Sequence, residues 1–229
     1  MQTETRPLLP LLLSLNGGYV DTAGFLALQG LFTAHVTGNF VTLGAAAVFG
    51  TSGALAKLLA LPVFCVVVVL TRLACHALDQ RHRPTLHIFL SVKLILLVLA
   101  AALAVRLGPF ADGDGWQAVV TGMTLVAAMA IQNAVHRIHL GTAPPTTLMT
   151  GTTTQIMIDV ADSFLDPTAQ NRLARLARLR RMSAHVAMFA AGCAAAALAY
   201  SLVQVWSFCI PPGLALCLLL LSLSSGRGA

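Results

Sequence analysis

Long apolar runs separated by short polar turns dominate the chain. The longest runs approach the roughly 20 residues that a helix needs to cross the hydrocarbon core of a bilayer. They predict about six spanning helices, at about residues 8–31, 55–78, 86–107, 116–138, 183–204 and 206–224. Two shorter, more polar segments lie at about 33–50 and 145–164. We therefore expect an all-α, polytopic transmembrane helix bundle with two short re-entrant or half-helix segments, forming a single membrane domain over residues 1–229.

The two short segments carry related motifs. Each motif follows a longer apolar segment with a polar residue, Asp21 in the first half and Asn133 in the second, at nearly the same spacing. A pattern that recurs once per half indicates an internal duplication, with repeat one at about 8–107 and repeat two at about 116–224. The motif residues are Thr37, Gly38 and Asn39 in the first repeat, and Thr150, Gly151 and Thr152 in the second.

Composition places the chain in a bilayer. Of its 229 residues, 57% are hydrophobic and 10% are charged, and the mean hydropathy is +0.82. A soluble domain carries about 25% charged residues. The net charge of +6 gathers in loops and does not form a continuous basic face, so we expect no nucleic-acid partner. The most basic stretch contains Arg172, Arg175, Arg178, Arg180 and Arg181.

Loop charges favour one topology. Basic loops tend to stay in the cytoplasm, and the two most basic loops contain Arg72 to Arg83 and Arg172 to Arg181. Both loops face the cytoplasm, together with both chain termini, if segments 33–50 and 145–164 enter the membrane and return. Each half then crosses three times, so the two repeats are inverted. The alternative, in which all eight segments cross, puts the two basic loops on opposite sides.

Polar residues inside the predicted helices are the candidate solute or coupling groups. A carboxylate at the bilayer centre costs about 2.5–3.5 kcal/mol on insertion scales, so Asp21 should face the bundle or a wet cavity. It could serve a solute or a proton, or it could accept hydrogen bonds from a neighbouring backbone segment. Asn133 is its uncharged counterpart. The two Thr-Gly motifs resemble helix starts, whose free N–H groups could bind an anion or a polar solute, or could simply be capped.

Secondary candidates are Asn16, His35, Lys93 and Gln132. We expect Lys93 to extend to the cytoplasmic interface; pairing with Asp21 or Asp159 is the alternative. His35 stands before the first motif, either as a satisfied polar group or as a pH gate. Asn16 precedes two glycines, which either loosen the helix or permit close packing. We expect solvent at the membrane interface to stabilise Asp159.

The basic stretch from Arg172 to Arg181 alternates with leucines. This pattern predicts an amphipathic helix on the inner leaflet that attracts anionic lipid, with topology anchoring as the simpler alternative. The lipid bilayer and an unknown small solute are the expected partners, and a homo-oligomer is an open possibility. Catalytic, metal-site and cofactor motifs such as H-E-x-x-H or a P-loop are missing, so we expect neither an enzyme nor a cofactor or metal site.

Several motifs together resemble the YoaK family of small bacterial integral membrane proteins, a domain of unknown function. They are Gly17–Asp21, Phe25-Leu26, Gly30–Asn39, Gln132-Asn133, Pro145–Thr147 and Thr150–Thr152. The resemblance spans essentially the whole chain and implies a multi-pass protein of the bacterial inner membrane. It implies no substrate, cofactor or catalytic residue.

Two functions remain open on these grounds. The first is a channel or secondary transporter for a small polar or anionic solute, with its site between the inverted repeats. The second is a non-transporting membrane accessory, scaffold or lipid-interacting protein. One cavity surrounded by Asp21, Asn39, Asn133 and Thr150 would favour the first. If Asp21 and Thr37 bonded only to backbone, with no central polar cavity, the second would be favoured.

Overall fold

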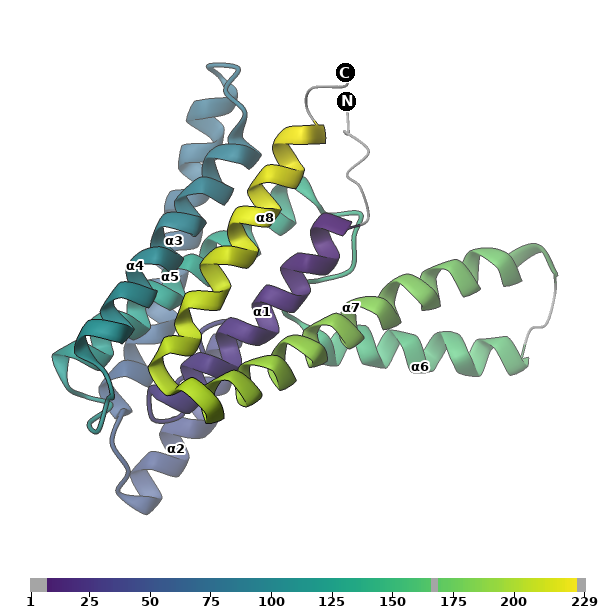
Figure 1. Ribbon diagram of the computed structural model, residues 1–229. Helices are drawn as coiled ribbons and strands as arrows, with labels where there is room; N and C mark the ends of the chain where they lie inside the picture. Colours follow the sequence, from purple (N-terminus) through teal and green to yellow (C-terminus); the bar gives the residue numbers. More distant parts are fainter. Residues whose placement is uncertain (1–7, 166–168, 226–229) are drawn as a thin grey trace.

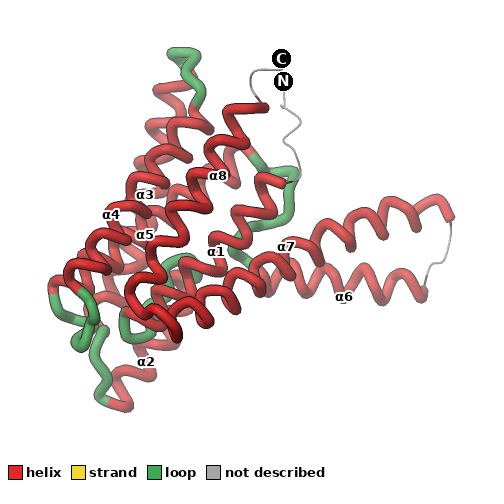
Figure 2. Tube along the Cα trace, in the orientation of Figure 1, coloured by secondary structure: helices red, strands yellow, loops and turns green. Residues whose placement is uncertain are grey.

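The computed structural model describes residues 8–165 and 169–225 and confirms the all-α fold. The chain termini, which the charge pattern places in the cytoplasm, lie outside these residues. The helices are α1 (Leu8–Ala27), α2 (Asn39–Phe49), α3 (Ala54–Asp79), α4 (Thr85–Leu107), α5 (Trp116–His139), α6 (Met149–Leu165), α7 (Ala169–Val203) and α8 (Ile210–Ser225). Two 3-10 turns join them, η1 (Val36–Gly38) before α2 and η2 (Gln204–Cys209) before α8. Loops gather mainly at the ends of the helices (Figure 2).

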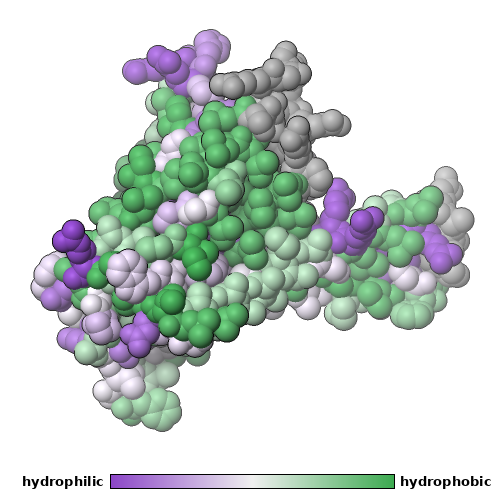
Figure 3. Space-filling view, viewed as in Figure 1, coloured by the Kyte–Doolittle hydropathy of each residue, from purple (hydrophilic) through white to green (hydrophobic). Residues whose placement is uncertain are grey.

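Four candidate membrane spans are found within the described residues by length and apolar composition. They are Ala54–Asp79, Thr85–Leu107, Trp116–His139 and a 52-residue stretch, Arg172–Leu223, that takes in most of α7 and α8. On the face shown in Figure 3, hydrophobic side chains cover most of the middle of the bundle, and hydrophilic patches gather toward its ends and on the α6–α7 projection. These features are those of an integral membrane protein.

Contacts between distant residues define two ends of the bundle. At the first end, a leucine cluster joins the start of α1, the start of α4, the residue after α5 and the last part of α8: Leu9, Leu90, Leu140 and Leu218. At the second end, Gln29 donates a hydrogen bond to the carbonyl of Phe110 (3.1 Å), and Asp114 accepts one from the N–H of Leu55 (2.7 Å). Helices α1 and α4 therefore run from the first end to the second, and α3, α5 and α8 run back.

Each of the two short helices, α2 and α6, begins a side excursion of the chain, which rejoins the bundle at the end from which it left. Because α1 ends and α3 begins at the second end, α2 makes a side excursion there (Figure 1). The second half of α7 runs alongside α1 in the same direction: His185 lies 2.8 Å from the Ser14 hydroxyl, and the Tyr19 hydroxyl donates to the carbonyl of Ser207 (2.9 Å). Helix α6 and the first half of α7 form a hairpin that projects from the bundle (Figure 1).

Helix α7 begins earlier than the apolar pattern predicts. Its hydrophobic part starts near residue 183, but the helix is continuous from Ala169. Alanine, arginine and leucine dominate the added residues, and all are strong helix formers. No proline or glycine interrupts the helix before Gly192. The basic segment is therefore the first half of α7 and packs on α6.

Close packing, and not unwinding, explains the glycine pair of α1. Helix α1 is continuous through Gly17 and Gly18. A Cβ atom on Gly18 would lie 2.2 Å from the carbonyl oxygen of Phe189, and one on Gly192 would lie 2.1 Å from that of Leu15. The backbones of α1 and α7 thus touch where they cross, as small residues permit in membrane helix pairs.

Candidate functional site

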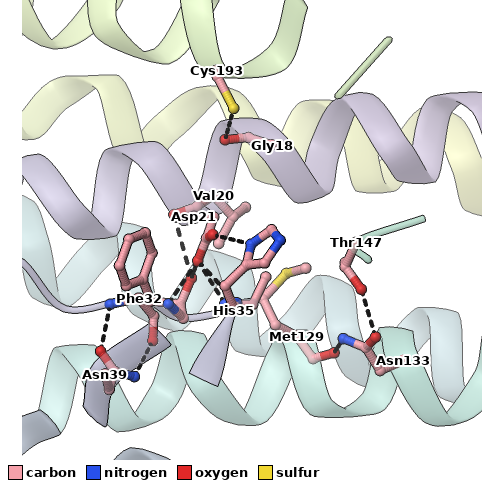
Figure 4. Close-up of polar contacts among 12 residues, drawn as sticks. Gly18, Val20, Asp21, Phe32, His35, Asn39, Met129, Asn133, Thr147 and Cys193 are labelled. Atoms are coloured by element: carbon pink, nitrogen blue, oxygen red, sulfur yellow. Dashed lines mark hydrogen bonds and ion pairs between the residues drawn. The ribbon is translucent and has the colours of Figure 1, made fainter. Parts of the chain in front are cut away.

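Asp21 accepts hydrogen bonds from the turn that leads into the first Thr-Gly motif. Its side chain is buried, with 4% of the residue exposed. One carboxylate oxygen accepts the N–H groups of Thr33 (2.8 Å) and Ala34 (2.7 Å). The other lies 2.7 Å from Nδ1 of His35, and the two form an ion pair when the imidazole is protonated (Figure 4). The alternative of a carboxylate that binds a neighbouring backbone segment is thus realised, with the His35 side chain as an additional partner.

The first motif begins a helix, as predicted, but its Asn39 is not a cap. The Asn39 side chain accepts the N–H of Phe32 (2.9 Å) and donates to the carbonyl of Phe32 (2.8 Å), so it is fully used in holding the loop (Figure 4). Gly38 lies beneath the Phe32 ring, where a Cβ atom would come within 3.0 Å of Cδ2. Thr37 is exposed. Of the three motif residues only Thr37 is exposed, since Gly38 also donates its N–H to the carbonyl of His35 (2.8 Å).

The second motif also lies at a helix start. Helix α6 begins at Met149; Thr150 and Gly151 are exposed, and the Thr152 hydroxyl donates to the carbonyl of Leu148 (3.0 Å). Asn133 accepts a hydrogen bond from the Thr147 hydroxyl (2.6 Å) and donates to the carbonyl of Met129 (Figure 4). Asn133 therefore anchors the segment before the second motif as Asp21 anchors the one before the first.

Two pockets meet at the turn held by Asp21. The first, of about 480 Å³, is lined in part by Asp21 and by the aromatic rings of Phe25, Phe32 and Phe189. The second, of about 470 Å³, is lined in part by Asn133, Arg72 and Arg137. His35 and Thr37 line both pockets. The turn from His35 to Thr37 is therefore the partition between them.

This arrangement differs from the single predicted cavity. Asp21 and Asn133 line separate pockets, and neither pocket is lined by Asn39 or Thr150. Asn39 is absent because both of its polar atoms are committed to Phe32. Arg72 and Arg137 are pocket residues that the sequence pattern assigned only to topology; their positions near the ends of two apolar helices were the signal that could have indicated more.

Lys93 lies in the bundle and does not extend to the interface. It is 1% exposed and donates a hydrogen bond to Oε1 of Gln132. Gln132 in turn donates to the carbonyl of Leu13 (3.0 Å) and to the Thr146 hydroxyl (3.3 Å). Both expectations for Lys93 are wrong, because its side chain meets an amide on α5 instead of solvent or a carboxylate. Gln132 links α4 and α5 with α1 and the loop before α6.

Asn16 links two other helices. Its Nδ2 donates to the carbonyl of Pro211 (3.1 Å), which joins α1 to the start of α8. Its Oδ1 is buried and has no hydrogen-bond partner within the described part of the chain. For metal chemistry, no group of three or more His, Cys, Asp or Glu residues suited to a metal ion gathers in the described ranges.

An ion pair fastens the projecting hairpin. Asp159 on α6 is 0% exposed, and the Arg178 guanidinium on α7 reaches its carboxylate through Nε (2.6 Å) and Nη2 (2.5 Å). These hydrogen bonds from Arg178 hold the pKa of Asp159 below its usual value. The expectation that solvent stabilises Asp159 is therefore wrong: its partner is an arginine.

We expect Asp159→Asn to loosen this hairpin. It removes a charge-assisted pair worth about 1–2 kcal/mol, since half of the Arg178 side chain is exposed and can be solvated. Because the folded pKa is lowered, the pair stabilises the hairpin above the unfolded pKa of about 4 and is lost as pH falls through the folded value. Limited proteolysis of the hairpin in detergent should accelerate for Asp159→Asn and not for Asp162→Asn, a matched change at an exposed carboxylate. Equal cleavage of both variants would contradict the role of the pair.

Comparison with known proteins yields one match. The model of a family described as a protein of unknown function (DUF1275) matches residues 9–221. No curated protein and no solved structure matches significantly. The match covers both Thr-Gly motifs, Asp21 and Asn133, and it agrees with the resemblance to YoaK-like proteins. The chain therefore belongs to this family of unknown function.

Proposed function

We propose that this protein is a channel or secondary transporter that passes a small anionic solute between two pockets separated by the turn from His35 to Thr37. The observation that carries the proposal is that both His35 and Thr37 line the two pockets. A shift of this short turn would join the pockets or close one of them. Discontinuous segments of this kind surround the sites of many transporters.

Charge favours an anion over a cation. The second pocket brings together Arg72 from α3 and Arg137 from α5. In the first pocket, both oxygens of the Asp21 carboxylate are already engaged, one by the N–H groups of Thr33 and Ala34 and the other by His35, so it offers little attraction to a cation. Arginine guanidinium groups bind carboxylate and phosphate groups well because of their fork geometry. Small organic or inorganic monoanions therefore fit the pocket chemistry best.

The contacts between helices support two inverted repeats. Helix α1 packs on α7 as its counterpart α5 packs on α3, and α8 packs on α1 as α4 packs on α5. Helix α6 packs on α7 as α2 packs on α3. The counterparts α1 and α5 run in opposite directions between the two ends of the bundle. Exchange of the halves thus preserves the contacts and reverses the direction, which is the relation expected for six crossings with α2 and α6 as side excursions.

The same contacts support an orientation. The first end of the bundle carries the turn with Arg81 and Arg83 and the end of α5 with Arg137. The second end is less basic, because Asp112 and Asp114 offset the cations Lys57 and Arg106. The positive-inside tendency assigns the first end to the cytoplasm. With the family resemblance, this orientation favours a bacterial inner-membrane protein with both termini in the cytoplasm.

The proposal is tested by anion flux in liposomes. The purified protein is reconstituted, and uptake of chloride, nitrate, formate, acetate and phosphate is followed by vesicle swelling and by dissipation of an imposed potential. We expect flux of at least one anion, and a loss of about tenfold for each of Arg72→Gln and Arg137→Gln, the equivalent of about 1.4 kcal/mol. Arg106→Gln, at an exposed arginine that lines neither pocket, is the matched control and should keep full flux.

The alternative is a non-transporting membrane accessory, scaffold or lipid-interacting protein. It is favoured by the full structural use of Asn39 and by the backbone bonds of Asp21. Vesicles that stay tight to all the anions and to sodium and potassium would support it. If the vesicles passed only cations, the protein would be a transporter or channel but the proposed anionic solute would be wrong.

A further inference from the structure

A groove of about 840 Å³ lies between the start of α1, the loop after α5 and the first half of α7. Its α1 wall is formed by Pro10 and Leu11. Three alanines line its α7 wall, and their small side chains leave the groove open: Ala174, Ala177 and Ala184. At one side the loop contributes Thr142 to Pro144. The lining is thus mostly apolar, and the groove belongs to neither pocket of the proposed solute site.

Two arginines lie beside this apolar groove. Arg180 and Arg181 line it, are exposed, and have no hydrogen-bond or ion-pair partner among the described residues. Arg178 differs, because Asp159 occupies its guanidinium. An adjoining pocket of about 210 Å³ includes Arg181, Arg178 and the same loop. No acidic side chain lines either space in the described part of the chain, so both favour a negative charge.

His185, the other titratable side chain that lines the groove, is buried. His185 is 4% exposed, and its Nδ1 lies 2.8 Å from the Ser14 hydroxyl. It therefore forms part of the groove wall between α7 and α1 and leaves the two arginines as the accessible cations. Guanidinium groups bind phosphate oxygens in paired hydrogen bonds.

We propose that this groove binds an anionic phospholipid, with the phosphate on Arg180 and Arg181 and the start of an acyl chain along the alanines of α7 and Leu11 of α1. The combination of a cationic edge with an apolar lining selects an amphiphile over a free anion. The volume lies within the range of about 300–1,000 Å³ that is typical of small-molecule sites and accommodates a headgroup with the first part of a chain. The sequence predicted contact with anionic lipid along the whole of residues 172–181, whereas this site uses only the last two arginines of that segment. The proposal does not depend on transport.

Native mass spectrometry and thermal unfolding of the detergent-solubilised full chain test this site. Phosphatidylglycerol and phosphatidylcholine with identical acyl chains are titrated in parallel. We expect phosphatidylglycerol to bind about tenfold more tightly and to raise the unfolding temperature. Arg180→Gln/Arg181→Gln should abolish this preference, and Ala177→Phe, which fills the groove and keeps its charge, should weaken binding of both lipids.

The matched control is Arg81→Gln/Arg83→Gln, an equal loss of charge at exposed residues outside the groove, at the first end of the bundle. It should leave the lipid preference unchanged. Equal affinity for the two lipids, or an unaltered preference in Arg180→Gln/Arg181→Gln, would overturn the proposal. Full displacement of the lipid by glycerol 1-phosphate at similar concentration would also overturn it, because the groove would then be a site for a soluble phosphate.

Discussion

Gly192→Ala is expected to separate α1 from α7 and to unfold the protein at a much lower temperature. A Cβ atom on Gly192 would lie 2.1 Å from the carbonyl oxygen of Leu15 and 2.9 Å from the backbone nitrogen of Tyr19. Both obstacles are backbone atoms, so no side-chain rotation relieves the clash. Overpacking in a core costs about 1–3 kcal/mol, and we expect at least the upper end here because two helices must shift as units.

The measurement is thermal unfolding of the purified protein in detergent, followed by circular dichroism and by elution on size-exclusion chromatography. Gly151→Ala is the control, because nothing lies within 4 Å of the Cβ position and the site is in a helix. Replacement of glycine by alanine in an exposed helix is expected to be neutral or to stabilise by up to about 1 kcal/mol. If Gly192→Ala unfolded at the temperature of the unmodified protein, α1 and α7 would not cross at this point.

Asp21→Ala should have the second large effect, since it removes the acceptor of five hydrogen bonds in one turn, three of them short. The N–H groups of Thr33 and Ala34 and the imidazole of His35 all lose their acceptor. A buried donor left without its acceptor costs about 1–3 kcal/mol, and Asp21→Ala leaves at least two such donors, the N–H groups of Thr33 and Ala34. Asp21→Asn keeps one oxygen for the two N–H groups and places an amide against His35, so the loss should be about 1–2 kcal/mol.

Flux and stability measured together separate two roles of Asp21. If the carboxylate carries a proton, Asp21→Asn should abolish pH-dependent uptake while the protein stays folded. Full uptake by Asp21→Asn would reject proton coupling and leave Asp21 as a positioning residue for the turn at His35. Asp112→Asn, at an exposed carboxylate of the second end, is the control and should change neither quantity.

Much of the helical framework could be predicted from the chain itself. The predicted segments at 55–78, 86–107 and 116–138 match α3, α4 and α5 within one residue at each boundary. Both Thr-Gly motifs lie at helix starts. These features depend on local sequence, because the length of an apolar run and the position of a glycine or threonine influence the backbone only within a few helical turns. The leucines of the basic stretch at 172–181 predicted a helix there, but its continuation into the apolar span as one helix, α7, was missed, because each pattern specifies only its own segment.

The partners of the buried polar groups could not be predicted in the same way. Lys93 was expected at the interface and Asp159 in solvent, but the first meets Gln132 and the second meets Arg178. Arg72 and Arg137 appeared only as topology signals, and the structure places both at one pocket. For Asp21, sequence reasoning left a solute role and a backbone role open. The structure shows its carboxylate hydrogen-bonded to the turn from Thr33 to His35.

The sequence by itself determined that this is an all-helical membrane protein with one Thr-Gly motif in each half of the chain. Burial in a bilayer depends on composition and run length, which are properties of each segment alone. Only the tertiary structure decided which polar groups satisfy one another and where the pockets lie. The reason is distance along the chain: a pair such as Ser14 and His185 is separated by 171 positions, and nothing in either local segment specifies the other. A buried polar group must find a partner, but its identity depends on how the helices pack.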